Sequence, residues 1–404
     1  MDLHRLFRPS SVAVVGASER EGSYGGQTLV NLSTIGYRGE VWGVNPRRKG
    51  VHGRPCFPSL RELPEVPDAV VVATPAASVP QVIDEAGAFG CGGAVVYAAG
   101  FAEIASGRAL QEELATAARR HGLPVCGPNG NGIVVVPQGV ALWGDALPRL
   151  EPGGVAIVSQ SGNQAVNALA TRRGLRFHTV ISCGNQAVLE AADYLAFLAR
   201  TDGVRSVALN LEADGDGPRL CDALAACADA GIGVAVLKVG SSKAGATAAA
   251  AHTGAVAGDQ RVFEALIEEA GAVLAADFHD LLEIAKALAL RRTPKRSAGS
   301  GKGGGGLAVM TCSGGDSSAA ADEAARLGVE FAALAPSTAR RLGELLPQTA
   351  TLANPLDYTA MIWGDRDRLR NLITAMADDP GVAVLLVFYD EPADLKGDPK
   401  LSWD

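Results

Sequence analysis

Short apolar runs alternate along this chain with Gly/Ser turns and Ala-rich amphipathic segments. The first run, Val12–Val15, is continuous in Val and Ala and ends at the turn 16–18 (GAS). Continuous runs of this kind indicate strands that are covered on both faces, and therefore parallel pairing through helical crossovers. Residues 1–145 are thus predicted as a doubly wound α/β domain. Its further predicted strands are Val41–Asn45, Ala69–Ala73, Ala94–Tyr97 and Pro124–Cys126, and its helices span 25–35, 78–89 and 106–121.

The same rhythm resumes after the turn 151–154 (EPGG) and predicts a second α/β domain, residues 146–294. Its predicted strands are Val155–Val158, Thr179–Ser182, Val204–Leu211 and Val234–Val239, and its helices span 162–173, 187–200, 217–230, 259–270 and 278–290.

A Gly-rich linker and a repeated motif follow. Six of the twelve residues 295–306 are Gly, which predicts a flexible linker. LAVMTCSG at 307–314 then repeats VAIVSQSG at 155–162. We interpret 307–404 as a second flavodoxin-like module, although α/β proteins often show this pattern. Because it supplies few βα units, we expect this module to be incomplete.

Composition narrows the class of protein. The 404 residues are 48% hydrophobic and 20% charged, which excludes a disordered chain. A net charge of −8 argues against nucleic-acid and basic membrane-surface partners. The seven cysteines are scattered without a C-x-x-C pair, so we predict neither a disulfide framework nor a metal site. No uncharged apolar run reaches 18 residues, and we expect a cytoplasmic protein without membrane contact.

The first strand-to-helix turn is a candidate anion site. Residues 16–26 (GASEREGSYGG) contain four glycines before a predicted helix, so backbone N–H groups can face a phosphate. The spacing is not G-x-G-x-x-G, and the second strand ends at Asn45 followed by 46–49 (PRRK) rather than by an acidic residue. Basic residues at this point suit NADP or coenzyme A; a solvated basic loop is the alternative.

Three other strand ends carry small polar turns, at 74–75 (TP), 98–101 (AAGF) and 127–130 (GPNG). Ligands of open α/β sheets bind at the carboxyl ends of the strands. Several such turns on one sheet edge predict a long cleft for an extended cofactor.

His252 differs from the other five histidines because very small residues surround it, in TAAAAHTGAVAG at 247–258. No second His or Cys lies nearby, so a metal site is not indicated. A structural histidine is the simple interpretation of this spacing. The alternative is a covalent phosphate carrier, since an imidazole nitrogen can accept a phosphoryl group while the other donates to a carboxylate. Glu212, at the end of strand 204–211, and the N–H groups of turn 159–163 (SQSGN) would then assist it.

Together these residues resemble one family over nearly the whole chain. The chain is similar to the NDP-forming acyl-CoA synthetases, such as ADP-forming acetate–CoA ligase, whose α part is similar to the succinyl-CoA synthetase α subunit. The motifs that carry the resemblance are VAVVGAS (12–18), GVNPR (43–47), AAGFAE (98–103), GPN (127–129), VSQSG (158–162), ISCGNQ (181–186) and, most specific, SKAGATAAAAHTGAVAGD (242–259).

The resemblance implies a Rossmann-like CoA-binding domain followed by two flavodoxin-like domains of the succinyl-CoA-synthetase type. It implies that acyl-CoA, ADP and phosphate are interconverted with a carboxylate, CoA and ATP through an acyl phosphate and a phosphohistidine. His252 would be the phosphohistidine and Glu212 its orienting carboxylate. Phosphate would be bound by Ser159, Ser161, Gly162, Asn163 and Gly254. Coenzyme A would be bound by Gly16, Ala17, Ser18, Gly25, Asn45, Arg47, Thr74, Pro75, Gly100 and Asn129.

The sequence departs from the family pattern in two places, and both affect the activity that we expect. Residues 130–132 read GNG where relatives usually carry Cys-Leu-Gly after GPN. No ATP-grasp segment is present, so ATP, ADP and Mg²⁺ would be bound by an ATP-grasp β-type subunit or domain. We therefore expect only partial activity from this chain alone, within an oligomer. The alternatives are an NADP-dependent oxidoreductase and a non-catalytic CoA-binding regulatory module.

Overall fold

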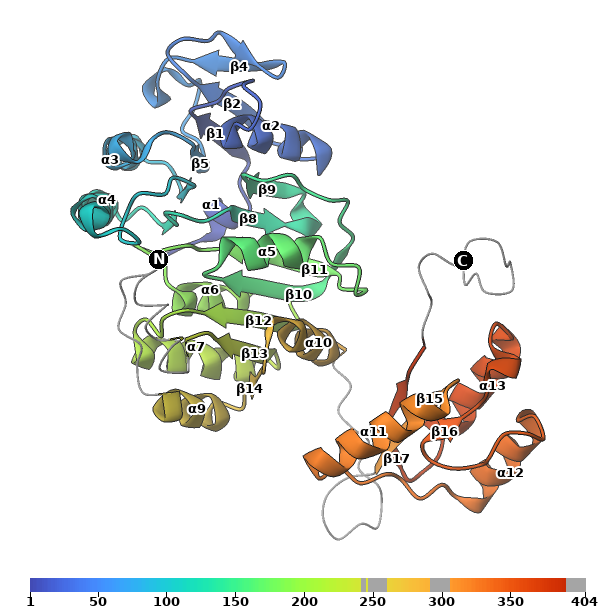
Figure 1. Cartoon of the computed structure of the whole chain (residues 1–404). Coiled ribbons are helices and arrows are strands. Elements are labelled where there is room, and N and C mark those ends of the chain that lie inside the picture. Colours follow the sequence, from blue (N-terminus) through green and yellow to red (C-terminus); the bar gives the residue numbers. More distant parts are fainter. Residues whose placement is uncertain (241–244, 246–259, 291–305, 390–404) are drawn as a thin grey trace. The chain divides into compact units, whose positions relative to one another are not determined.

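The computed structural model describes residues 1–240, 245, 260–290 and 306–389. The chain divides into two compact units, Met1–Arg291 and Arg292–Asp404, and each is described by itself (Figure 1).

The first unit contains two seven-stranded sheets. The first sheet has the order β3-β4-β2-β1-β5-β6-β7 and is parallel except for the β3–β4 hairpin. Taken without β3, its strands follow the order 3-2-1-4-5-6 of dinucleotide-binding sheets. The strands are β1 (Ser11–Val15), β2 (Glu40–Val44), β3 (Gly50–Val51), β4 (Arg54–Phe57), β5 (Ala69–Val72), β6 (Ala94–Val96) and β7 (Val125–Cys126).

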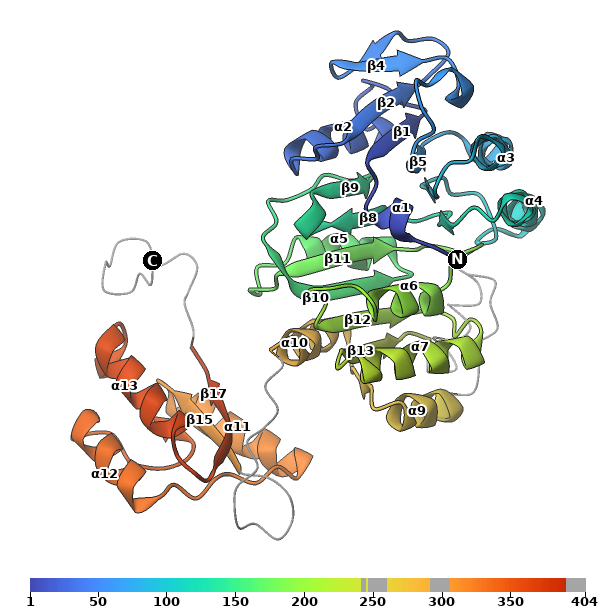
Figure 2. The same ribbon diagram turned by 180° about the vertical axis from the view of Figure 1, so that it is seen from behind.

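Both faces of this sheet are covered, as the continuous apolar runs predict. Every residue of β1 is buried: Val12 and Val14 pack on the side of α2, and Ala13 and Val15 on the side of α3 and α4. Figures 1 and 2 show α3 and α4 side by side. The helical elements are α1 (His4–Phe7), α2 (Tyr24–Thr34), η1 (Leu60–Glu62), η2 (Ala76–Ser78), α3 (Val79–Phe89), η3 (Ala105–Gly107) and α4 (Arg108–His121).

The second sheet has the order β14-β13-β12-β10-β11-β8-β9. Its parallel part follows the flavodoxin-like order 2-1-3-4-5, with α5 and α10 on one face and α6, α7 and α9 on the other. The strands are β8 (Gly132–Val135), β9 (Val140–Trp143), β10 (Pro152–Ser159), β11 (Phe177–Ser182), β12 (Ser206–Leu211), β13 (Gly233–Lys238) and β14 (Val273–Leu274). The helices are η4 (Val136–Gln138), α5 (Gly162–Leu169), α6 (Ala191–Leu198), α7 (Gly217–Asp229), α9 (Gln260–Glu269) and α10 (Phe278–Leu288).

Strands β8 and β9 depart from the predicted pattern. Residues 132–143, expected at the end of the first domain, form an antiparallel pair that joins the second sheet through β8 and β11. Both strands are fully buried, and their apolar sequence resembles that of the inner parallel strands. The sequence pattern alone therefore does not show that they run antiparallel to their neighbours. The chain therefore crosses between the sheets before residue 132, not near residue 145.

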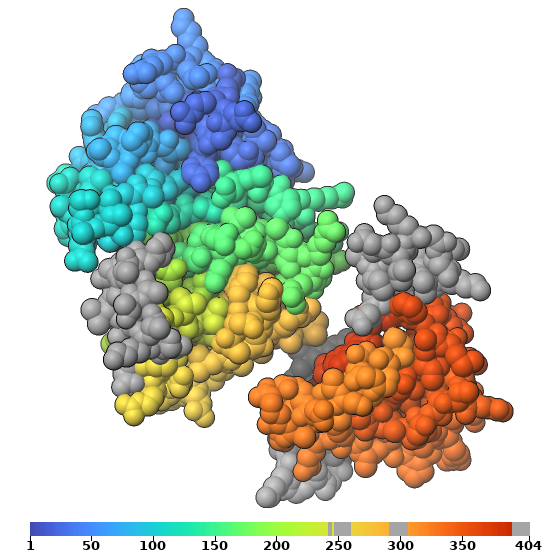
Figure 3. Space-filling model, in the orientation of Figure 1, coloured from blue at the N-terminus to red at the C-terminus, as the bar shows by residue number. Residues whose placement is uncertain are grey.

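One hydrophobic cluster runs through both sheets of the first unit. It joins Val12 and Val14 of β1 to Val158 of β10 and Val207 of β12. In the space-filling view the blue and green parts of the surface are continuous (Figure 3). The two sheets thus share a core and hold their strand ends in a fixed relation.

The second unit is a small parallel sheet of order β16-β15-β17. The predicted repeat has a structural counterpart here: Ser313 caps α11 by accepting from the Asp316 N–H, as Ser161 caps α5 by accepting from the Gln164 N–H. The elements are β15 (Gly306–Thr311), α11 (Gly314–Leu327), α12 (Pro336–Leu345), β16 (Leu356–Asp357), η5 (Ala360–Ile362), α13 (Arg366–Ala377) and β17 (Val382–Val387). Among the helices described in either unit, none is long and apolar enough to span a bilayer.

Candidate functional site

A cavity of about 800 Å³ lies where strands of both sheets end. From the first sheet it is lined by Ala73 and Thr74, directly after β5, and from the second by Gln160 and Glu212, directly after β10 and β12. The β1/β5 and β10/β12 neighbours are the positions where the strand order of each sheet reverses, and such switch points are where open α/β sheets bind ligands. Two binding edges therefore face one cavity.

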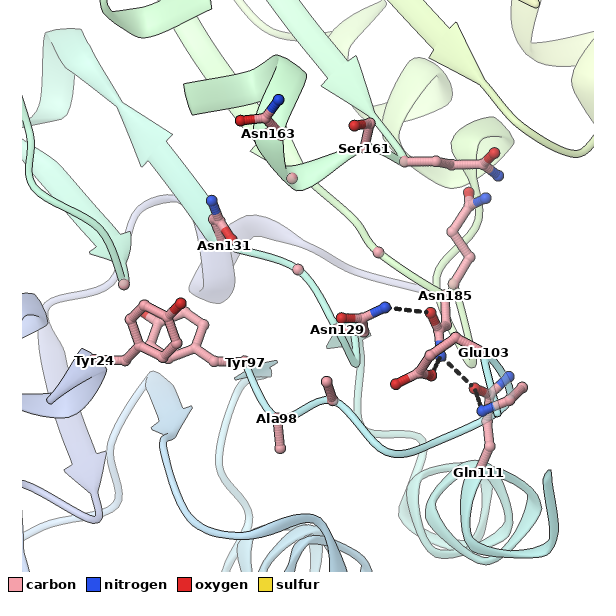
Figure 4. A pocket seen from close by; sticks show the side chains of 18 of the residues that line it. Tyr24, Tyr97, Ala98, Glu103, Gln111, Asn129, Asn131, Ser161, Asn163 and Asn185 are labelled. Carbon is pink, nitrogen blue, oxygen red and sulfur yellow. Dashed lines mark hydrogen bonds between the residues drawn. The ribbon is translucent and has the colours of Figure 1, made fainter. Parts of the chain in front are cut away.

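Side-chain hydrogen bonds fix the turn after β10, which leads into the N-terminus of α5. Ser159 is buried, and its Oγ donates to the Ser161 carbonyl at 2.8 Å while it accepts from Asn210 Nδ2 at 3.1 Å. Ser161 caps α5 with its hydroxyl. Ser161, Gly162 and Asn163 line the cavity at the start of α5 (Figure 4). A helix N-terminus with its first N–H groups facing a cavity is a favourable place for an anion.

Glu212 is held in place by the side chain of Gln160. Gln160 Oε1 accepts from the backbone N–H of Glu212 and, at 2.9 Å, from that of Ala213. Gln160 Nε2 donates to the Ala213 carbonyl at 3.4 Å. One amide side chain thus ties the turn after β10 to the backbone of Glu212 and Ala213.

An amide network forms the opposite wall of the cavity (Figure 4). Asn185 Nδ2 donates to Glu103 Oε2 at 2.5 Å and to Gln111 Oε1 at 3.0 Å. Asn129 Nδ2 donates to Asn185 Oδ1 at 3.2 Å. Because Glu103 and Gln111 come from the first half of the unit and Asn185 follows β11, the network joins the two halves across the cavity.

Glu103 is a carboxylate in this network. Partial burial acts to raise its pKa, but hydrogen bonds from Asn185 and from the Gly100 and Phe101 N–H groups outweigh that effect, so the pKa of Glu103 is lowered. Arg20 is the one basic residue among the described residues of the lining, against Glu103, Glu190 and Glu212. An anion in this cavity would therefore find few side-chain cations among the described lining residues.

Two tyrosines line another part of the cavity. The rings of Tyr24 and Tyr97 are 5.9 Å apart in an edge-to-face arrangement. Tyr97 is buried and its hydroxyl lies 2.9 Å from Thr28 Oγ1. Asn131, beside them, donates to Asp145 Oδ2 at 2.7 Å, and burial raises the pKa of Asp145. This region offers an aromatic surface next to a fixed amide.

The turn after β1, residues 16–18, packs closely against the end of β5 and is bonded to the end of β2. Gly16 has φ +86°, and a Cβ there would lie 2.5 Å from the Ala73 carbonyl oxygen, so only glycine fits. Asn45 Nδ2 donates to the Ala17 carbonyl at 2.9 Å and holds the turn to the end of β2. A second cavity of about 290 Å³ adjoins the first, and both are lined by Arg20, Gly22, Ser23, Tyr24 and Gly144.

The predicted site residues are distributed as follows. The larger cavity is lined by Glu212, Ser161, Gly162, Asn163, Thr74 and Asn129. The following predicted residues do not line it: Ser159, Gly16, Ala17, Ser18, Gly25, Asn45, Arg47, Pro75 and Gly100. Of these, Ser159, Gly16 and Asn45 shape the turns, and Arg47 is exposed. His252 and Gly254 lie outside the described residues.

Several residues that line the larger cavity were not predicted as site residues. Tyr97 is the last residue of the predicted strand 94–97, and Asn185 lies three residues after the predicted strand 179–182, so both lie near strand ends of the kind that located Thr74. Tyr24 and Glu103 lie within the stretches 16–26 and 98–103 but received no predicted role, and Gln111 lies on α4 outside every motif. Among the residues that the structure describes, no group of three or more His, Cys, Asp or Glu side chains is arranged to hold a metal ion.

Two domain models match the chain. Residues 10–136 match the CoA binding domain, and residues 152–288 match the succinyl-CoA ligase like flavodoxin domain. These ranges carry the two strand edges that face the cavity.

Two curated relatives that match almost all of this chain are acetate–CoA ligases. The ADP-forming acetate–CoA ligase I of Archaeoglobus fulgidus is 33% identical over 97% of this chain and 56% of its own length. The ADP-forming acetate–CoA ligase II subunit alpha of Pyrococcus furiosus is 32% identical over 96% of this chain and 83% of its own. A solved structure of dinucleotide forming acetyl-coenzyme A synthetase 1 from Ca. Korarchaeum cryptofilum, in complex with phosphate and ADP, has a TM-score of 0.85 at 30% identity. It covers 96% of this chain and 81% of the solved chain. The present chain thus spans little more than half of the Archaeoglobus relative.

Proposed function

Because this chain belongs to the ADP-forming acetate–CoA ligase family as an α-type part, we propose that it performs the acyl-transfer half of an NDP-forming acyl-CoA synthetase. The full reaction is acyl-CoA + ADP + phosphate ⇌ carboxylate + CoA + ATP. One observation carries the proposal: residues of the CoA-binding half and the turn after β10 line the same cavity. A thioester bound from one side and a phosphate bound from the other would be brought together there.

CoA would reach this point along the smaller cavity. Arg20 and Tyr24 line both cavities, so a long ligand bound in the smaller one would lie next to the larger one. Thr74 and Asn129 would contact it at the carboxyl ends of the first sheet. Gly16 lets the backbone of the first turn approach closely.

The first step is attack of a phosphate oxygen on the thioester carbonyl carbon. The carbon–sulfur bond breaks, and the products are an acyl phosphate and the CoA thiol. Phosphate would be bound by the Ser161 hydroxyl and by the N–H groups of Gly162 and Asn163, with the α5 dipole favouring its charge. These donors are fixed before the reaction by the Ser159 and Ser161 bonds, so no reorganisation is needed.

In the second step an imidazole nitrogen of His252 takes the phosphoryl group from the acyl phosphate, and the carboxylate leaves. Glu212 would accept a hydrogen bond from the other ring nitrogen, which orients the ring and stabilises its positive charge. Support for these roles comes from the motif at 242–259 and from the lining position of Glu212.

The third step returns the phosphoryl group to ADP. We propose that an ATP-grasp subunit or domain binds the nucleotide and Mg²⁺. This is supported by the Pyrococcus relative, which is itself an alpha subunit, and by the length of the Archaeoglobus relative.

Phosphorylation of the isolated chain tests the proposal. Incubation with acetyl-CoA and radiolabelled phosphate is expected to release CoA thiol and to leave an acid-labile, base-stable label on the protein. His252→Asn is expected to abolish the label, and Glu212→Gln to slow its formation by on the order of 100-fold. The matched control is His279→Asn, at an exposed position of α10, which should label like the wild type.

Two outcomes would contradict this proposal. Label that survives in His252→Asn removes His252 from its role. Calorimetric titration that detects NADP binding but no CoA binding would favour the oxidoreductase alternative, and CoA binding without any labelling would favour a regulatory module.

A further inference from the structure

Lys238 is a buried cation beside the loop that carries Glu212. It is the last residue of β13 and the register partner of Leu211, the last residue of β12. Its side chain is 2% exposed, and Nζ lies 2.5 Å from Asp214 Oδ1. We call residues 212–216, between β12 and α7, the Glu212 loop.

Lys238 also contacts α9. Its Nζ lies 4.4 Å from the centre of the Phe263 ring, over the ring face. Phe263 is buried in the same core cluster as Leu209 and Leu211. One ammonium thus joins three elements: the end of β13, the Glu212 loop and α9. In the sequence, the motif with His252 lies between Lys238 and α9.

Within the described part of the chain, Gln160 and Glu190 bond to the two ends of the Glu212 loop. Gln160 binds the N–H groups of Glu212 and Ala213 at one end. Glu190 Oε2 accepts from the Asp216 N–H at 3.4 Å at the other end. Asp214, between them, is paired with Lys238.

Packing alone does not explain a lysine at this position. Removal of an ammonium from water is costly, and the pairing with Asp214 and the Phe263 ring offsets this cost only in part. Neither Nζ nor Oδ1 completes a well-aligned hydrogen bond within the described part of the chain, so the contact is one of charge. An apolar side chain of similar length would fill the space without the desolvation cost. The charge of Lys238 is therefore better explained by its contact with Asp214 in the Glu212 loop than by packing.

We propose that Lys238 is a positioning residue for Glu212 and acts through Asp214. The inference rests on the proposed role of Glu212 toward His252. Loss of the ion pair frees the centre of the Glu212 loop, while the Gln160 contact remains. The Glu212 carboxylate then samples orientations that do not face the imidazole, and misplacement on the ångström scale is enough to slow a reaction by orders of magnitude.

Amide hydrogen exchange tests the positioning without any reaction. In Lys238→Met, which keeps the length and apolar body of the side chain, exchange of the amides at residues 214 and 215 is expected to rise about tenfold, while those of residues 212 and 213 stay bonded to Gln160. Lys238→Arg keeps the charge and should stay near the wild type. Lys238→Met combined with Asp214→Asn removes the unpaired carboxylate and should show the same rise, which separates loss of the pair from a general loss of stability. Unchanged exchange in both Met variants overturns the inference.

A double-mutant cycle then tests whether Lys238 acts through Glu212. In the labelling experiment with acetyl-CoA and phosphate, Lys238→Met should slow labelling about tenfold or more in the wild-type background. In the Glu212→Gln background it should slow labelling by less than about twofold. Equal slowing in both backgrounds overturns the inference while the proposed function stands. Absence of label in the wild-type chain overturns the proposed function, and faster exchange in Lys238→Met would then still support the positioning of the loop.

Discussion

Asn185 Nδ2 lies 2.5 Å from Glu103 Oε2, and this hydrogen bond links the turn after β11 to the loop after β6. The carboxylate form of Glu103 is the acceptor, and its pKa is lowered in the folded chain. Each half of the first unit therefore contributes one partner to a bond on the cavity wall.

Stability should depend on pH through Glu103. Because its folded pKa lies below the ordinary value, its contribution is full above that value and is lost as the pH falls through the lowered pKa. Glu103→Gln should therefore be less stable than the wild type at about pH 7, and the difference should shrink toward about pH 3.5. Urea unfolding at both pH values measures this. Glu113→Gln, at an exposed position of α4, should follow the wild-type pH profile; a constant gap for Glu103→Gln would contradict the assignment.

Gly16→Ala should damage the first turn more than a similar change elsewhere. At Gly16 the new Cβ would meet the Ala73 carbonyl oxygen at 2.5 Å and would also force a positive φ. At Gly53, which has φ +72°, nothing lies within 4 Å, so only backbone strain of about 1–2 kcal/mol is expected. Thermal unfolding and CoA titration should show a larger loss for Gly16→Ala in both measurements. Equal losses would indicate that the close approach to Ala73 is unimportant.

Ser161→Ala and Ser313→Ala separate capping from binding. Each serine caps a helix, so each change should cost about 1 kcal/mol of stability. Ser161 also lines the cavity, and its loss should slow labelling from acetyl-CoA and phosphate by tenfold or more. Ser313→Ala should label at the wild-type rate. A comparable decrease in both variants would remove Ser161 from the phosphate site.

Two glycines of the second unit should respond in opposite directions. Gly343 lies in α12, exposed and with free space around its Cβ position, so Gly343→Ala should stabilise the unit by about 0.5–1 kcal/mol. Gly328 ends α11 with φ +65°, and Gly328→Ala should destabilise it by about 1 kcal/mol. Chemical unfolding of the full chain measures both changes. The same sign for both would contradict the helix assignments.

The strands were the most predictable part of the fold. β1 and β5 are almost entirely apolar and are followed by small residues, and burial on both faces demands such runs. β8 and β9 have the same composition, yet they pair antiparallel with a sheet whose other strands come later in the chain. A local pattern reports burial but not the partner, so their place was not predictable.

The site was predictable where it follows strand ends and less so elsewhere. Thr74, Asn129 and Glu212 were found because the carboxyl ends of parallel strands gather at one edge. Gln111 and Glu103 line the cavity and accept hydrogen bonds from Asn185 of the other half of the unit. Such contacts between distant segments leave no spacing in the sequence. The strand-to-helix turn 159–163, supported by the motif resemblance, located Ser161, Gly162 and Asn163, which line the cavity. The basic stretch after the second strand suggested Arg47, which does not.

The β8–β9 pair also bears on how members of this family can be cut and recombined. A cut at residue 145 would separate β8 and β9 from the second sheet, and the part that begins after the cut would expose the edge of β11 to aggregation. Chimeras that exchange the CoA-binding half should therefore be joined between β7 and β8, between residues 126 and 132, where no sheet is divided.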